Sequence, residues 1–202
     1  MPSPRRLTDF EQILIGLTVG SPRSGYDLKR FFSSTPAVVY EPSSGALYPA
    51  LRRLERRSLL CSEVAVSAGK RKQRRYLATD AGLAAHGRWL RSPVDPATVG
   101  RDLGVHLMRF ALAEGSLTAI EVHRFLNQLG DALEAFVSAM EEFARDTSLP
   151  GRHPALAIEH GLAVHRASLS WVRKASGILA GSSEVCADDI LTTECAQAER
   201  RL

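Results

Sequence analysis

The stretch SSGALYPALRRLERR, residues 43–57, predicts a helix with two contrasting faces. Leu47, Leu51 and Leu54 recur at helical spacing, so they form an apolar face that can be buried. Small residues and arginines share the opposite side, with a tyrosine at its edge: Gly45, Pro49, Arg52, Arg56 and Tyr48. Small residues permit close approach to a partner, and arginines can reach phosphates or guanine edges. The stretch is therefore either a recognition helix for DNA or a surface helix whose arginines are simply solvated.

The segments around this stretch predict two earlier helices and a following β-hairpin. Thr8–Glu11 is a capping box at the start of one helix, and Ser24–Asp27 has the residues of a second helix start. Residues 59–66 and 74–78 are rich in β-compatible side chains and flank a turn glycine, which indicates two paired strands. A fourth helix is expected over residues 80–91. Three helices, a hairpin and a connecting helix, in this order, are typical of a winged helix–turn–helix domain.

Positive charge is concentrated in this predicted domain. Residues 1–91 carry 16 Lys and Arg against 7 Asp and Glu, a net charge of +9, whereas residues 92–202 carry 10 against 15, a net charge of −5. Five cations lie within six positions at the hairpin tip: Lys70, Arg71, Lys72, Arg74 and Arg75. A cationic loop alone is usually just solvated. Here the loop comes directly after a candidate recognition helix, and this combination favours double-stranded DNA as the partner, with an anionic membrane surface as the second choice.

The second half of the chain is predicted to be helical and to do a different job. A proline-rich linker, residues 92–98, precedes a helical domain over residues 99–181. From Val122 to Phe143 the apolar residues alternate spacings of four and three, which is a heptad seam, and Ala155–Ala180 reads as its antiparallel partner helix. Such a seam can pair within one chain or between two chains. Residues 182–202 form a polar tail that is either disordered or a short helix.

Composition argues against several other classes of protein. The three cysteines are far apart and odd in number, which predicts neither a disulfide framework nor a zinc site and suits a reducing compartment. The chain shows no signal sequence and no apolar run of transmembrane length, so we expect a cytoplasmic protein that does not enter a membrane. No HExxH, GxSxG, Walker A or GxGxxG motif is present, so we assign no catalytic residue, metal ligand or cofactor. An enzyme and a purely helical interaction module remain the alternatives.

Four strings in the first half resemble the PadR family of transcriptional regulators: ILIGL at 13–17, GYDL at 25–28, GALYPALRRLE at 45–55 and RYLATDAG at 75–82. The string LYPALxxLE is the most specific of them, and it accounts for a proline inside a predicted helix. Departures are Ala78 in place of the usual leucine, an arginine-rich wing and a tail without a counterpart. The resemblance implies a homodimeric repressor of the two-domain branch, in which C-terminal helices form the dimer interface. It also implies that a small aromatic or amphipathic molecule lowers the affinity for DNA.

These inferences give a mainly α-helical fold with a small β-hairpin: a winged helix–turn–helix domain followed by an antiparallel helical dimerisation domain. We expect the protein to bind an inverted-repeat operator whose half-sites lie about 34 Å apart. The expected DNA contacts come from the second helix, the third helix and the hairpin: Tyr26, Lys29, Ser43, Ser44, Gly45, Tyr48, Pro49, Arg52, Arg56, Lys70, Arg71, Lys72 and Arg74. Trp89 and Trp171 either belong to the core or stack on an effector.

Overall fold

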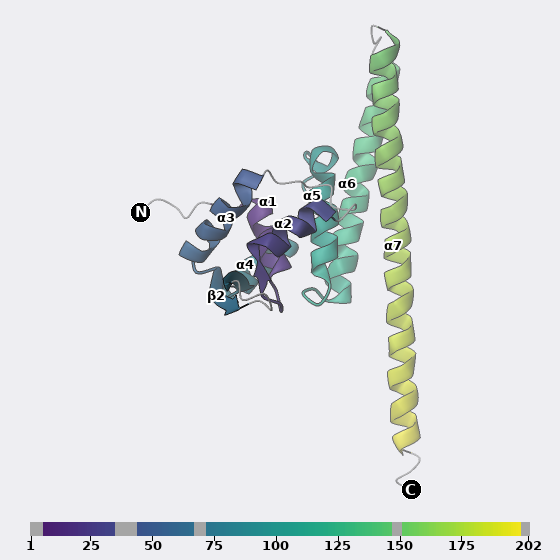
Figure 1. The fold of residues 1–202 in the computed structure, drawn as a ribbon. Helices are drawn as coiled ribbons and strands as arrows, with labels where there is room; N and C mark the ends of the chain where they lie inside the picture. Colours follow the sequence, from purple (N-terminus) through teal and green to yellow (C-terminus); the bar gives the residue numbers. More distant parts are fainter. Residues whose placement is uncertain (1–5, 35–43, 67–71, 147–150, 199–202) are drawn as a thin grey trace. The chain divides into compact units, whose positions relative to one another are not determined.

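The computed structural model is mainly α-helical with one small antiparallel sheet (Figure 1). It describes the chain over four stretches: residues 6–34, 44–66, 72–146 and 151–198. The chain divides into two compact units, each formed from two segments: Met1–Ser92 with Leu103–Leu117, and Pro93–Asp102 with Thr118–Leu202.

The first unit has the element order of a winged helix–turn–helix domain. Its elements are α1 (Asp9–Leu17), β1 (Arg23–Ser24), α2 (Gly25–Ser34), α3 (Ser44–Arg56), β2 (Leu60–Val66), β3 (Lys72–Ala78) and α4 (Asp80–Leu90). The strands form an antiparallel sheet in the order β1-β3-β2. The sequence predicted only the β2–β3 hairpin, because a two-residue strand such as β1 has no periodicity that could reveal it.

Capping hydrogen bonds stabilise the starts of the first two helices, as the capping residues in the sequence predict. The backbone N–H of Glu11 donates to Thr8 Oγ1 at 3.2 Å, and the Glu11 carboxylate accepts from the Thr8 N–H at 3.0 Å. At the start of α2, the Ser24 N–H donates to Asp27 Oδ2 at 2.9 Å, and the Asp27 N–H donates to Ser24 Oγ at 3.1 Å. These bridges satisfy backbone groups that have no partner within their own helix. Both helix starts are therefore encoded locally.

The core of the first unit confirms the apolar face predicted for α3. Leu47, Leu51 and Leu54 are all buried, together with apolar residues of α1 such as Ile13 and Leu14. This burial leaves the opposite face of α3 available to solvent or to a partner.

Helix α5 (Val99–Ala113) contributes to both units. Asp102 has non-helical backbone angles, φ −101° and ψ 17°, and the two units divide at this residue. Within the first unit, the buried Arg109 donates to the backbone oxygens of Leu90 and Ser92, at the end of α4. Residues 103–117 thus belong to the compact unit of the winged helix. These compact units do not test where the functional domains begin and end, so the limits 1–91 and 99–181 stay a prediction.

The second unit is built on α6 (Ala119–Asp146) and α7 (Arg152–Ala198). Leu126, Leu129 and Leu133 of the predicted seam are fully buried, and Leu169 and Val172 of α7 are buried as well. Ion pairs join α6 to α7 in opposite chain order: Glu134 with Arg173, and Glu141 with Arg166. The two helices are therefore antiparallel, as expected, and Figure 1 shows them side by side. Helix α7 runs to Ala198, beyond the end near residue 180 that the sequence suggested.

Candidate nucleic-acid interface

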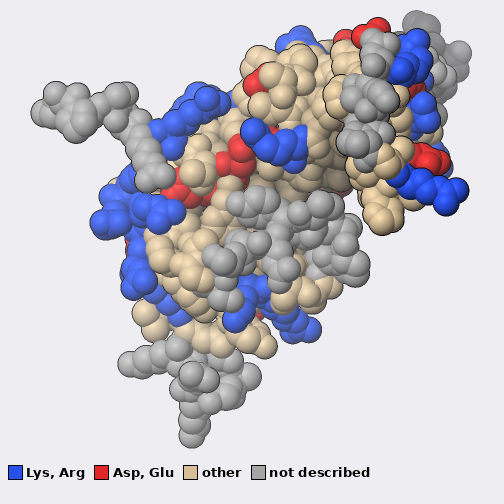
Figure 2. Space-filling model, turned by 90° about the horizontal axis from the view of Figure 1, so that it is seen from above, with Lys and Arg blue, Asp and Glu red and all other residues tan. Residues whose placement is uncertain are grey.

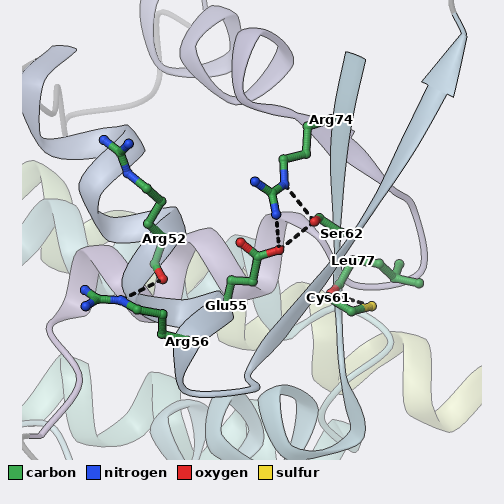
Figure 3. A network of polar contacts seen from close by, with 7 residues as sticks. All are labelled: Arg52, Glu55, Arg56, Cys61, Ser62, Arg74 and Leu77. Carbon is green, nitrogen blue, oxygen red and sulfur yellow. Dashed lines mark hydrogen bonds and ion pairs between the residues drawn. The ribbon is translucent and has the colours of Figure 1, made fainter. Parts of the chain in front are cut away.

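The outer face of α3 carries the side chains that the sequence assigned to DNA. Gly45, Arg52 and Arg56 are exposed, and 46% of Tyr48 is accessible. Figure 3 shows the Arg52 and Arg56 side chains extending from α3 on the side away from Arg74. Neither arginine forms an ion pair with another residue in the described part of the chain. Both guanidinium groups are therefore available to an anionic partner.

A hollow of about 340 Å³ lies beside this face, between the start of α2, α3 and β3. Its lining includes three residues that the sequence assigned to DNA, Tyr26, Tyr48 and Arg74, and four that it did not, Ser24, Gly25, Gln73 and Tyr76. Tyr26 is 65% exposed, so its ring projects from the surface and is not part of the core. The structure thus brings α2, α3 and the wing, which is the hairpin of β2 and β3, together around one concave, partly aromatic surface.

The close approach of Tyr48 to α2 requires a glycine. A Cβ atom at Gly25 would lie 2.6 Å from Cε1 of Tyr48, which is well inside van der Waals contact. Gly25 itself is buried. The glycine of the string GYDL is therefore explained by packing, because it lets the Tyr48 ring lie directly on the first turn of α2.

On its other side, α3 is joined to α1 by an ion pair. Arg53 Nε donates to Glu11 Oε1 at 2.8 Å, and only 6% of the Glu11 side chain is exposed. Burial raises the pKa of Glu11, but hydrogen bonds from Thr8 and Arg53, together with the Arg53 charge, outweigh it and leave the pKa below its usual value. Glu11 thus serves as both a helix cap and an anchor for α3, and the sequence indicated only the cap.

A second polar network joins α3 to the wing (Figure 3). Arg74 Nη2 donates to Glu55 Oε1 at 2.7 Å, and Arg74 Nε donates to Ser62 Oγ at 2.8 Å. The Ser62 hydroxyl in turn donates to Glu55 Oε1 at 2.6 Å. The sequence assigned Arg74 to DNA and missed Glu55 and Ser62, because their juxtaposition depends on how α3 packs against the sheet.

The remaining predicted DNA contacts are described to different extents. Lys29 is exposed on α2, and Pro49 is partly buried within α3. Ser43, Lys70 and Arg71 lie outside the described residues, and for Ser44 and Lys72 only the backbone is described, at the starts of α3 and β3. Figure 2 shows Lys and Arg side chains standing at several places on the surface, with acidic side chains between some of them. The assignment of these residues to DNA stays a prediction.

The two tryptophans belong to different units. Trp89 Nε1 donates to Asp9 Oδ1 at 2.8 Å, which ties α4 to the first turn of α1. The Trp89 ring also lies 5.5 Å from the His86 ring and 5.7 Å from the Arg109 guanidinium. Trp171 is partly buried in α7 of the second unit. These contacts give Trp89 a role in packing the first unit, and an effector role for either residue remains a prediction.

The described residues contain no group of three or more His, Cys, Asp and Glu side chains that could hold a metal ion. None of their helices is long and apolar enough to cross a membrane.

Three packed helices, the third with arginines on its exposed face, and an adjacent β-hairpin wing define the class of winged helix–turn–helix proteins. Residues 13–88 match the family model described as the transcriptional regulator PadR-like family. The domain that contains residues 13–88 is thus PadR-like. This match confirms the resemblance drawn from the sequence motifs and the expectation of a regulator, not an enzyme.

Similarity to individual proteins extends into the C-terminal half. A probable transcriptional regulator of Mycobacterium tuberculosis is 21% identical over 162 residues, which cover 74% of this chain and 86% of that protein. Bacillus subtilis PadR, solved in complex with operator DNA, is 19% identical, with 85% of this chain and 99% of that chain covered and a TM-score of 0.43. The same protein solved with p-coumaric acid gives 18% identity, coverages of 88% and 98%, and a TM-score of 0.40.

Proposed function

We propose that this chain is a homodimeric repressor that binds an inverted-repeat DNA operator through α3 and the wing and is released by a small planar ligand. One observation carries the DNA-binding part: the buried leucine face of α3 leaves Arg52, Arg56 and Tyr48 exposed beside the wing. Arginines on a helix of this kind can donate to phosphates and to guanine edges in the major groove. A DNA-binding regulator must share a compartment with its operator, so we expect this protein in the cytoplasm.

The second unit supports the dimeric part of the proposal. Several large apolar side chains of α6 and α7 are exposed: Ile120, Phe143, Leu156, Val164, Ile178 and Leu179. Exposed apolar residues in this number on two helices favour an interface, and homodimers with twofold symmetry are the commonest oligomers. A symmetric dimer would present two copies of α3, which accounts for an operator with two inverted half-sites.

The ligand-responsive part rests on the family and on aromatic chemistry. The related Bacillus subtilis PadR has been solved with p-coumaric acid, a planar aromatic molecule. Trp89 and Trp171 are aromatic side chains on which such a molecule could stack. A tenfold loss of DNA affinity needs only about 1.4 kcal/mol of preference for the DNA-free form.

The direct test is selection of bound fragments from a random-sequence pool by the purified full chain. We expect enrichment of an inverted repeat, and Arg52→Ala to weaken binding to the enriched duplex about tenfold, since a base contact is worth about 1–3 kcal/mol. Arg124→Ala, which removes the same charge from an exposed site on α6, should change affinity by less than about twofold. If no fragment is enriched over random competitor at moderate salt, the proposed function is wrong.

A further inference from the structure

We propose that Glu55 is a positioning residue, which holds Arg74 of the wing against the recognition helix and so determines sequence preference. The inference rests on the proposed function, because it concerns how two DNA-contacting elements are joined to each other. It assigns Glu55 and Ser62 a role in recognition without requiring either to touch DNA.

The three side chains form a closed ring of hydrogen bonds, with one member each from α3, β2 and β3. Ser62 Oγ accepts from Arg74 Nε and donates to Glu55 Oε1, so its single proton and one of its lone pairs are both used. Glu55 Oε1 accepts from both partners. A ring of this kind fixes direction as well as distance, because each bond constrains the orientation of the next group.

The strand register places the ring on the face of the sheet that carries the buried Tyr76. Ser62 lies opposite Tyr76, and Val64 lies opposite Arg74, so all four side chains share one face of the sheet. Tyr76 on this face is buried, and its ring lies 5.9 Å from the Arg74 guanidinium. Arg74 is therefore held by a carboxylate and a hydroxyl and also lies near an aromatic ring.

Glu55 places a negative charge within the surface proposed to bind DNA. A carboxylate in a surface that binds a polyanion repels that partner, so by charge alone Glu55 would weaken binding to DNA. A charge-assisted bond to Arg74 offsets this cost by orienting the arginine. The ring uses Nε and Nη2 of Arg74, which leaves Nη1 for a phosphate or a base edge. Glu55 thus lowers the general electrostatic attraction to DNA but holds the Arg74 side chain in one defined position.

The test compares two variants of the full chain that remove the same charge. Glu55→Gln loses the carboxylate of the ring, whereas Glu63→Gln loses an exposed carboxylate from the same strand pair, on the opposite face of the sheet. Affinities are measured over a range of salt concentrations for two duplexes of equal length. One is enriched by the wild-type protein from a random pool, and the other is of random sequence.

We expect Glu63→Gln to raise both affinities by the same factor, so that their ratio stays at the wild-type value. Glu55→Gln should lower that ratio about fivefold or more, because the released Arg74 strengthens binding to random DNA and weakens binding to the enriched duplex. The salt slope on random DNA should steepen by up to about 0.9, the value for one added phosphate contact. Ser62→Ala changes no charge, and it should still lower the ratio at least about twofold.

Thermal unfolding of each variant shows whether the fold is retained, and Ser62→Ala provides the same test if Glu55→Gln does not fold. Equal ratios for Glu55→Gln, Ser62→Ala and Glu63→Gln would overturn the positioning role while leaving the proposed function intact. A wild-type protein that binds the two duplexes equally would instead overturn the proposed function, and this inference with it.

Discussion

The arginines of the first unit have different environments in the structure. Arg53 pairs with the buried carboxylate of Glu11, and Arg74 closes the ring with Glu55 and Ser62. Arg52 is exposed and forms no ion pair within the described residues. A partly buried ion pair helps to stabilise the fold, whereas an unpaired exposed arginine adds little to stability and is available to an anionic partner. Residue identity alone therefore does not separate stabilising arginines from binding ones.

At the residue scale, Gly45→Ala should separate stability from DNA binding. Among the described residues, no atom lies within 4 Å of a Cβ at Gly45, so alanine should stabilise helix α3 by about 0.5 kcal/mol. The same methyl group would stand on the face proposed to approach DNA, and we expect affinity for the enriched duplex to fall about tenfold. Gly177→Ala in α7, also without a close neighbour, should leave DNA affinity unchanged. Urea unfolding and competition binding measure the two effects, and unchanged affinity in Gly45→Ala would contradict the docking face.

His86 makes stability depend on pH. The side chain is buried, and burial lowers its pKa to about 4, although the nearby backbone of Gln12 opposes the shift. Below the unfolded pKa of about 6.5 the unfolded chain takes up a proton that the folded chain resists, so stability falls as pH falls towards 4. We expect His86 to contribute a loss of about 2 kcal/mol in the free energy of unfolding between pH 7.5 and pH 5.

Urea unfolding at the two pH values, followed by tryptophan fluorescence, measures this loss. His86→Gln should make the pH dependence shallower by that amount, whereas replacement of the exposed His160 by Gln should not change it. Equal pH dependence in the wild type and His86→Gln would show that His86 is not held neutral.

At the scale of elements, backbone contacts between segments explain why certain positions are glycine. A Cβ at Gly82, in the first turn of α4, would lie 2.1 Å from the backbone oxygen of Leu59. The N–H of Thr79 donates to the same oxygen at 3.1 Å, so the start of α4 is joined to the turn before β2. Backbone atoms cannot move aside as the end of a side chain can, so this glycine determines how closely α4 approaches the turn.

Gly82→Ala should therefore destabilise the first unit by about 2 kcal/mol or more, as expected for overpacking against a backbone atom. Gly87→Ala in the same helix is the matched control. Outside the helix's own backbone, a Cβ at that position would lie closest to Arg91 Nη1, at 2.9 Å, which is the end of a flexible side chain. Helix propensity should make Gly87→Ala neutral or slightly stabilising. Thermal unfolding compares the two, and equal midpoints would refute the backbone clash.

At the scale of the whole molecule, α5 does not belong to the second half alone. Met108 lies in the core of the first unit. The side chain of Leu112 lies next to Gly16, as does the side chain of His86. Arg109 caps the end of α4. A chain cut before Val99 would lose all of these contacts, although the linker at 92–98 looks like a natural boundary in the sequence.

We therefore expect residues 1–117 to unfold cooperatively, and residues 1–98 to melt at least roughly 10 °C lower, because several kcal/mol of core packing are lost. By light scattering, the full chain should be a dimer and residues 1–117 a monomer, with much weaker binding to the enriched duplex because its two half-sites no longer act together. A dimeric fragment would place the interface in the first unit. Equal melting points for the two fragments would show that residues 103–117 are not part of its core.

The sequence alone determined the features that depend on short-range chemistry. Capping residues such as Thr8 and Glu11 marked where helices begin, and the leucine spacing of α3 predicted which face is buried. The PadR-like motifs then identified the domain, because they combine helix, turn and strand signals in one order. These features follow from contacts between residues that are near each other in the chain.

Only the tertiary structure decided the features that depend on packing between distant segments. The strand β1, the return of α5 to the first unit and the ring of Glu55, Ser62 and Arg74 all join residues far apart in sequence. No periodicity or spacing records such contacts, since they arise only when helices and strands pack together. The difference between Arg52 and Arg74, one exposed and one engaged by Glu55, is the clearest consequence, because both read as DNA contacts in the sequence.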